Sequence, residues 1–88
     1  MYQIYKTKSF TRWASKAGLT DLILIEAVIE MVAGLVDADI GGGVVKKRVA
    51  QPGHGKRGSA RTLLATNFGD RWIFVYGFEK NERSNINS

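Results

Sequence analysis

The sequence predicts an α+β fold in which one β-strand is followed by two helices and then by three strands of an antiparallel sheet. Apolar and polar residues alternate at the start of the chain and again after residue 43, which is the period of β-strands. Between these segments the apolar residues have the spacing of helices. The chain has 88 residues, enough for one core of modest size, so we expect a single domain over residues 1–88.

The first half of the chain contains the predicted first strand, residues 2–6, and both helices. The apolar residues that follow the strand recur at helical spacing: Phe10, Trp13, Ala14 and Ala17. Gly18 is placed to end this helix in the left-handed conformation. Thr20 is suited to cap a second helix, and the largely apolar segment 22–36 predicts that this helix is long and well buried. Its polar stripe comprises Glu26, Glu30 and Asp37.

The second half predicts three strands, at residues 44–50, 61–66 and 71–79. The first is rich in β-branched residues and ends before Pro52, and residues 67–70 have the composition of a turn. Two helices between the first strand and such a meander can cover one face of the sheet. The other face is then open to water or to a ligand.

Charge is distributed unevenly along the chain. The net charge is +5, but residues 1–42 sum to −1 and residues 43–88 sum to +6. This asymmetry favours a polyanionic partner, most often nucleic acid, and the alternative is a solvated basic surface or a contact with an acidic protein. The absence of cysteine excludes disulfides and thiolate metal sites, and one histidine does not by itself make a metal cluster. No apolar run is long enough to span a bilayer, and we expect a cytoplasmic protein.

Strand geometry sorts the basic residues between the two faces of the sheet. Because side chains alternate along a strand, Lys46 and Arg48 should lie on the open face, while Lys47 points with the valines and lies at the sheet edge. The same rule, with Ile73 and Val75 on one face, places four residues of the last strand on the other: Phe74, Tyr76, Phe78 and Lys80. Cations beside aromatic rings suit single-stranded nucleic acid. The alternative is that Phe74 and Phe78 form a second small core.

A glycine-rich basic loop, Q-P-G-H-G-K-R-G-S, precedes the strand that Arg61 opens. We expect this loop at the rim of the open face, with His54, Lys56 and Arg57 near the nucleic acid. Arg61 could project to the same face as Lys46 and Arg48.

Three features of the sequence together resemble a known family. They are the order of the predicted elements in a small basic chain, the segment V-K-K-R-V-A-Q-P-G-H-G-K-R-G-S-A-R-T-L-L, and the ending F-V-Y-G-F-E-K-N-E-R-S-N-I. They resemble the RelE/HigB branch of the RelE/ParE toxin superfamily over nearly the whole chain. The resemblance implies a toxin of a type II toxin–antitoxin module that enters the ribosomal A site and cleaves messenger RNA there. It also implies a cognate antitoxin that holds the toxin inactive, and no metal or other cofactor.

The resemblance assigns roles to the basic residues by position. Lys46 and Arg48, two apart on the strand after the helices, would grip the RNA backbone around the scissile phosphate. Arg61, after a small-residue turn, would stabilise the charge of the pentacoordinate transition state. Further RNA contacts are expected from neighbouring residues: Lys47, His54, Lys56, Arg57, Phe78 and Arg83.

The ending departs from the family pattern. Where RelE proteins have K-R-E-R and a tyrosine four residues later, this chain has K-N-E-R at residues 80–83 and no tyrosine after it. RNA cleavage through the 2′-hydroxyl needs a proton acceptor and a proton donor. The candidates are Tyr76, His54 and Lys80. Related toxins also continue into a further helical segment where this chain stops at Ser88, so the chain is either naturally short or lacks a C-terminal piece.

Two other functions remain open at this point. One is a ParE-like poison of DNA gyrase, which has the same fold and a different target. The other is a non-catalytic remnant of a toxin that binds nucleic acid or protein. The basic residues expected on the sheet favour the endonuclease, because gyrase poisons usually lack such a cluster. A remnant would be distinguished by expression without harm to the cell.

Overall fold

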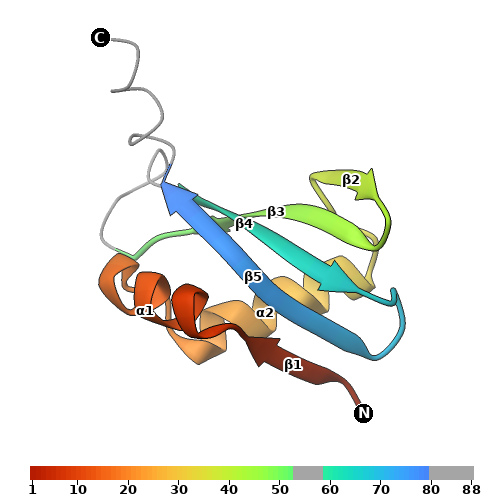
Figure 1. Cartoon of the computed structure of the whole chain (residues 1–88), viewed down its shortest axis with the longest axis horizontal. Coiled ribbons are helices and arrows are strands. Elements are labelled where there is room, and N and C mark those ends of the chain that lie inside the picture. Colours follow the sequence, from red (N-terminus) through yellow and green to blue (C-terminus); the bar gives the residue numbers. More distant parts are fainter. Residues whose placement is uncertain (53–58, 80–88) are drawn as a thin grey trace, which may run out of the picture.

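The computed structural model describes residues 1–52 and 59–79, which form two helices and a five-stranded sheet (Figure 1). In chain order the elements are β1 (Gln3–Lys6), α1 (Lys8–Ala17), α2 (Asp21–Val32), β2 (Ala38–Gly41), β3 (Val44–Ala50), β4 (Ser59–Thr66) and β5 (Arg71–Glu79). The strands lie in the order β1-β5-β4-β3-β2. The predicted α+β class is confirmed. Neither helix in the described part of the chain is long and apolar enough to cross a membrane.

The first helix has the boundaries that its capping residues dictate. The Thr7 hydroxyl accepts a hydrogen bond from the Phe10 amide at 3.1 Å, which satisfies one of the free amides at the helix start. Gly18 ends the helix with φ +78°, and its amide donates to the carbonyls of Ala14 and Ser15. Both ends of α1 are therefore explained by residues within one turn of them.

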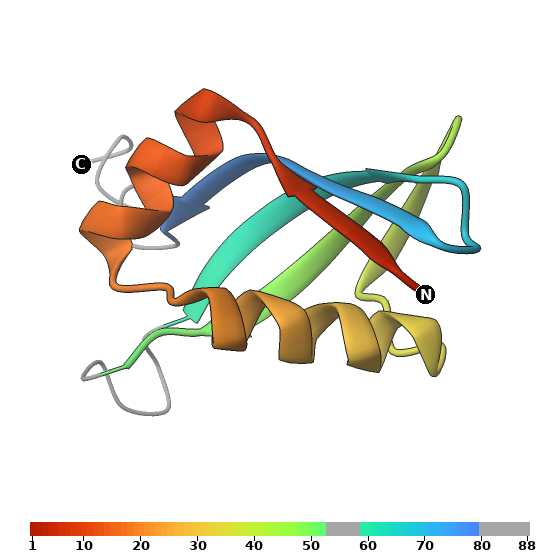
Figure 2. The same ribbon diagram turned by 90° about the horizontal axis from the view of Figure 1, so that it is seen from below.

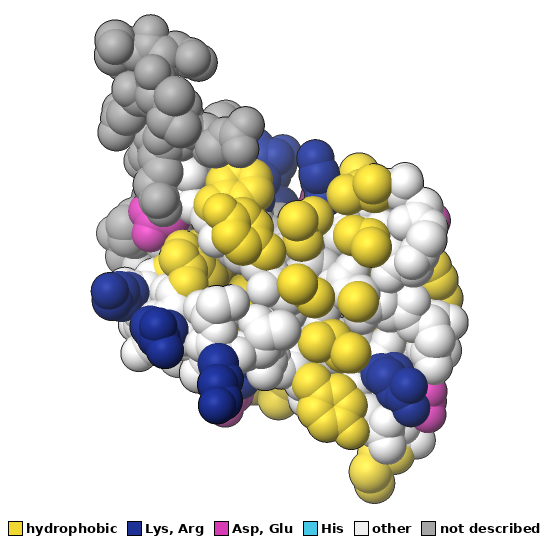
Figure 3. All heavy atoms as spheres, viewed as in Figure 1, with side chains coloured by type: hydrophobic (Ala, Val, Ile, Leu, Met, Phe, Trp, Pro, Cys, Tyr) yellow, Lys and Arg dark blue, Asp and Glu magenta, His cyan; other side chains and the backbone are white. Residues whose placement is uncertain are grey.

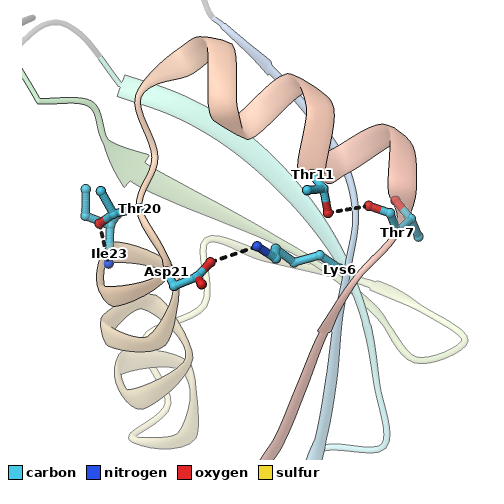
Figure 4. A network of polar contacts seen from close by, with 6 residues as sticks. All are labelled: Lys6, Thr7, Thr11, Thr20, Asp21 and Ile23. Carbon is cyan, nitrogen blue, oxygen red and sulfur yellow. Dashed lines mark hydrogen bonds and ion pairs between the residues drawn. The ribbon is translucent and has the colours of Figure 1, made fainter.

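The second helix starts as predicted and ends four residues earlier than predicted. The Thr20 hydroxyl accepts from the Ile23 amide at 3.3 Å (Figure 4). Gly34 has φ +97°, and the Leu35 amide donates to the Glu30 carbonyl at 2.9 Å, which is the bond pattern of a glycine-terminated helix. A glycine able to take this conformation stops the helix, although apolar residues continue beyond it.

Helix α2 is also less buried than its composition predicts. Only its inner face is covered, by the sheet, and that face comprises Leu24, Ala27, Val28 and Met31. Four apolar side chains face solvent and form what we call the α2 outer stripe: Leu22, Ile25, Ile29 and Val32. Leu22 is 66% exposed and Ile29 is 61% exposed.

Strand β2 is not predictable from the sequence pattern. It is short, fully exposed and ends in glycine, so it lacks the alternation that reveals a half-buried strand. It pairs antiparallel with β3, with Ala38 opposite Lys46. Gly42 and Gly43 turn the chain between the two strands with φ of +65° and +80°.

The sheet is mixed rather than antiparallel throughout. Strand β1 pairs in parallel with β5, with Ile4 beside Trp72, and the other neighbouring strands are antiparallel. The parallel pair arises because the chain leaves β1 through two helices and returns to its side only with the last strand. An ion pair between Lys6 and Asp21, 2.7 Å from Nζ to Oδ1, ties β1 to the start of α2 (Figure 4).

One core lies between the sheet and the helices. Helix α1 packs against β5 and α2 packs against β3, and Figure 2 shows the twisted sheet with α2 along one side of it and α1 beside β5. Phe10 of α1 stacks on Phe74 of β5 with ring centroids 5.0 Å apart. Side chains of both helices and of the three central strands belong to the same buried cluster. The opposite face of the sheet carries no helix in the part that the structure describes, as predicted.

Candidate nucleic-acid interface

The open face of the sheet is organised in three rows that cross the strands. The register of β3, β4, β5 and β1 defines them. The basic row is Arg48, Arg61 and Phe78; the middle row is Lys46, Leu63 and Tyr76; the apolar row is Val44, Ala65, Ile73 and Tyr5. The face therefore changes from charged to apolar along the strands. Figure 3 shows hydrophobic side chains over the middle of this face and Lys or Arg side chains at its margin.

Three of the cations predicted to hold RNA come together at one end of this face. Lys46, Arg48 and Arg61 line a common cavity of about 270 Å³. Lys46 and Arg48 are exposed and alternate with buried Val45 and Val49, as strand geometry predicts. Arg61 is half-buried and lies directly opposite Arg48 on β4. None of these three cations forms an ion pair with a residue that the structure describes.

An acidic residue that sequence reasoning missed lies beside these cations. Asp37 lines the same cavity, and its carboxylate accepts a hydrogen bond from the Arg48 amide. Its own amide donates to the Lys46 carbonyl at 3.0 Å. Because β2 pairs with β3 only as far as Lys46, the Arg48 amide lies at an edge without a strand partner. Asp37 supplies the missing acceptor and fixes the strand that carries two of the cations.

The predicted place of Asp37 in the polar stripe of the second helix is wrong, because the helix ends at Val32. The contact joins residues 11 positions apart, and only the pairing of β2 with β3 brings them together. Sequence alone offered one usable signal, which was an aspartate a few residues after a glycine able to end a helix.

Two aromatic side chains adjoin the cations. Tyr76 and Phe78 lie on the open face, opposite Leu63 and Arg61, with ring centroids 6.0 Å apart. Tyr76 is 55% exposed. Their rings and the neighbouring cations form the combination that binds single-stranded nucleic acid.

The predicted position of Phe74 on this face is wrong. Phe74 is fully buried in the core, and Ile73 lies on the open face instead. The cause is a bulge in β5: Leu63 pairs with Tyr76 and Leu64 pairs with Phe74, so Val75 is an extra residue. A bulge shifts the alternation by one residue, which sequence periodicity does not reveal. The alternative of a second small core is also wrong for Phe74, because it belongs to the main one.

Helix α1 fixes the backbone between the two aromatic residues. The ring of Trp13 covers Gly77 so closely that a β-carbon there would be 2.2 Å from ring carbon Cζ3. Gly77 is therefore required for this contact. Trp13 also contributes to a cavity of about 220 Å³ beside Tyr76 and Phe78.

Lys47, which was predicted to contact RNA, has its side chain on the opposite side of the sheet from Lys46 and Arg48. Its side chain points with Val45 and Val49, as predicted, but it is buried on the helix side of the sheet. Its ammonium group lies 2.8 Å from the Glu30 carboxylate and donates to the Leu35 carbonyl at 3.0 Å. Lys47 also contributes to the lining of the cavity shared by Lys46, Arg48 and Arg61, although its side chain is 7% exposed. Its polar contacts link β3 to the end of α2.

Five predicted site residues lie outside the residues that the structure describes. They are His54, Lys56 and Arg57 in the basic loop, and Lys80 and Arg83 near the C-terminus. Their predicted roles as RNA contacts or proton donors stay predictions.

Comparison with known proteins identifies the family. Residues 2–88 match the family model described as the RelE toxin of the RelE/RelB toxin–antitoxin system. A search of curated proteins found no match. The resemblance to the RelE/ParE superfamily is confirmed, and placement in the HigB branch stays a prediction. The chain therefore belongs to the RelE toxin family, as the toxin of a toxin–antitoxin system whose partner is an antitoxin.

Proposed function

We propose that this toxin is a ribosome-dependent endoribonuclease that cleaves messenger RNA in the ribosomal A site and so stops translation. One observation carries the proposal: Lys46, Arg48 and Arg61 converge on one cavity, next to the exposed ring of Tyr76 and the half-buried ring of Phe78. Cations hold phosphates and rings stack on unpaired bases. Messenger RNA in the A site is single-stranded and presents both.

The reaction we propose is attack of a ribose 2′-oxygen on the adjacent phosphorus. The bond from the 2′-oxygen to phosphorus forms and the bond to the 5′-oxygen breaks, leaving a cyclic phosphate and a free 5′-hydroxyl. One proton leaves the 2′-hydroxyl and one is delivered to the 5′-oxygen. The nucleophile belongs to the RNA itself, and we propose that protein cations supply the positive charge without a metal.

Each cation has a proposed role that follows from its place. Lys46 and Arg48 are exposed on one strand and would hold the phosphates on either side of the scissile bond. Arg61 is half-buried and lies between Arg48 on β3 and Phe78 on β5. A cation fixed in this way can stabilise the charge that develops on the phosphate. Tyr76, with its exposed ring, is placed to stack on a base or to exchange a proton, and Lys80 is the second candidate for the proton donor.

The alternative functions make different demands on the same surface. A poison of DNA gyrase does not need a cluster of cations beside aromatic rings. A non-catalytic remnant does not need its cations to be arranged around a phosphate. The convergence of Arg61 with Lys46 and Arg48 therefore favours the endonuclease.

Expression of the toxin in bacteria tests this function. We expect growth arrest, and primer extension on a reporter transcript should reveal new 5′ ends inside the reading frame. A reporter without a start codon is the control, and it should stay intact because it does not recruit elongating ribosomes. Growth arrest with intact transcripts and changed plasmid supercoiling would support the gyrase alternative. Harmless expression of folded protein would support the remnant.

A further inference from the structure

Gln51 is a buried polar residue to which the proposed function gives no role. It follows β3 directly and is 5% exposed. Its amide nitrogen, Nε2, donates one hydrogen bond to the Ala17 carbonyl and another to Oε1 of Glu79, each at 3.2 Å. Ala17 is the last residue of α1 and Glu79 is the last residue of β5. One side chain therefore joins the ends of three elements, which lie on the same side of the molecule (Figure 1).

The chemistry of an amide group suits these two acceptors. Its nitrogen carries two hydrogens, so each acceptor can receive one. The Ala17 carbonyl lies in the last turn of α1, where carbonyls have no partner within the helix. A buried polar group that loses its partner destabilises the folded state, so these bonds resist separation of the three ends. We call Ala17, Gln51 and Glu79 together the Gln51 bridge.

The Gln51 bridge crosses β4, the strand that carries Arg61. Because β4 lies between β3 and β5 in the sheet, a bond from the end of β3 to the end of β5 spans it. Ala60 of β4 pairs with Glu79, is fully buried and carries only a methyl group. Arg61 is the next residue, and its side chain lies on the open face opposite Arg48. The bridge and Arg61 therefore lie on opposite faces of the same end of β4.

Charge repulsion acts on this end of the sheet. Arg48 and Arg61 lie opposite one another on β3 and β4, and like charges in such a pair repel. The repulsion favours separation of the two strands near the point where β3 ends, at Ala50. Gln51 is the next residue, and its bonds to β5 and α1 oppose that separation.

We propose that Gln51 is a positioning residue for Arg61. The Gln51 bridge holds β3 and β5 in place on both sides of β4, so the guanidinium group of Arg61 meets the phosphate in one position. A cation fixed in advance stabilises a developing charge without reorganisation during the reaction. Gln51 itself does not contact RNA, because its side chain is buried on the helix side of the sheet. The effect on cleavage rests on the proposed function, whereas the restraint on Arg61 does not.

Single-turnover cleavage on programmed ribosomes tests this role. Gln51→Met keeps an unbranched side chain in the buried space and lacks both donors. At saturating toxin it should cleave at least about tenfold more slowly than wild type, because Arg61 is less well placed. Its Kd for the ribosome should stay within about threefold of wild type, since Lys46 and Arg48 still hold phosphates. Gln51→Ala should behave in the same way and serves if Gln51→Met does not fold.

Two further variants separate positioning from a general loss of stability. Glu79→Gln keeps a side-chain oxygen that accepts the bond from Gln51, so its saturated rate should stay within about threefold of wild type. Asn67→Ala is the matched destabilised control, because it removes the hydrogen bonds of the turn at the opposite end of β4 and β5. It should cleave at the wild-type rate once bound. Circular dichroism spectra confirm that each variant is folded.

NMR relaxation of the Arg61 Nε–H group in the free toxin tests the restraint without ribosomes. The order parameter of this group reports its motion on the picosecond to nanosecond timescale. It should fall in Gln51→Met and keep its wild-type value in Asn67→Ala.

The outcomes are distinct. Wild-type cleavage rates in folded Gln51→Met and Gln51→Ala would overturn the proposal. Weaker ribosome binding with an unchanged saturated rate would also overturn it, because Gln51 would then act on binding and not through Arg61. A wild-type toxin that never cleaves RNA would contradict the proposed function, and the relaxation measurement would still decide the restraint: an unchanged order parameter in Gln51→Met would refute it.

Discussion

Arg48 and Arg61 lie directly opposite one another on the neighbouring strands β3 and β4. Like charges in such a pair are destabilising, by roughly 0.2–1 kcal/mol. No acid in the described part of the chain forms an ion pair with either residue. A pair of this kind weakens the folded state and suits a surface that binds a polyanion, which agrees with the binding site that we propose on the open face.

The first prediction concerns the stability cost of this pair. Arg61→Gln removes one charge and keeps most of the side chain, so the free energy of unfolding should rise by a few tenths to about 1 kcal/mol. Urea denaturation at low salt measures this change, and the gain should shrink at high salt, because screening weakens the repulsion. Arg71→Gln is the control, since Arg71 lies opposite uncharged Gln3, and it should give no gain. A less stable Arg61→Gln would contradict our interpretation of the pair.

The second prediction concerns the two exposed cations of β3. Lys46→Ala and Arg48→Ala should each relieve toxicity in a growth assay, because RNA loses a phosphate contact, while neither change reaches the core. Circular dichroism and thermal unfolding should match wild type within a few degrees. Unfolding of either variant would show that these side chains support the fold rather than bind RNA.

The third prediction concerns Lys47, which is buried and paired with Glu30. Lys47→Ala should lower the free energy of unfolding by about 1–2 kcal/mol, because a buried stem and the bonds to Glu30 and Leu35 are lost. Lys47→Met keeps the stem and should restore part of this loss. Chemical denaturation of the two variants separates packing from polar contacts. If Lys47→Ala is as stable as wild type and loses toxicity, Lys47 belongs to the RNA site after all.

The fourth prediction concerns Asp37. Asp37→Ala leaves the Arg48 amide at the edge of β3 without its acceptor, and we expect a loss of about 1 kcal/mol in the free energy of unfolding together with faster amide exchange at Arg48. Asp37→Asn keeps a side-chain oxygen and should retain most of the protection. Hydrogen exchange followed by NMR measures it residue by residue. Equal protection in Asp37→Ala would mean that the carboxylate does not hold this strand.

Local signals in the sequence were enough to predict much of the fold. Thr7 and Thr20 cap helices through contacts three residues away, and Gly18 ends the first helix through its own conformation. Strand β2 and the parallel pairing of β1 were not predictable in this way. Their stability comes from partners distant in the sequence, and neither strand has a local pattern that reveals its neighbour.

The candidate site was predictable where successive side chains of a strand alternate strictly between the two faces of the sheet. It was not predictable where this alternation is interrupted. Lys46 and Arg48 lie on the open face because they alternate with Val45, Lys47 and Val49, which are buried on the other face. Phe74 was misplaced, since the bulge at Val75 reverses the alternation within β5. Asp37 could not be found from spacing, because its contact with Arg48 depends on the hairpin formed by β2 and β3.

The central claim is that Arg61 stabilises the transition state of RNA cleavage, and single-turnover kinetics test it most directly. Wild type and Arg61→Ala are compared on ribosomes programmed with a defined A-site codon, at toxin concentrations that saturate binding. We predict that Arg61→Ala cleaves about 10²- to 10³-fold more slowly once bound, as for loss of a transition-state contact. A variant that cleaves at the wild-type rate when saturated would remove Arg61 from catalysis, and a wild-type toxin that never cuts would contradict the endonuclease itself.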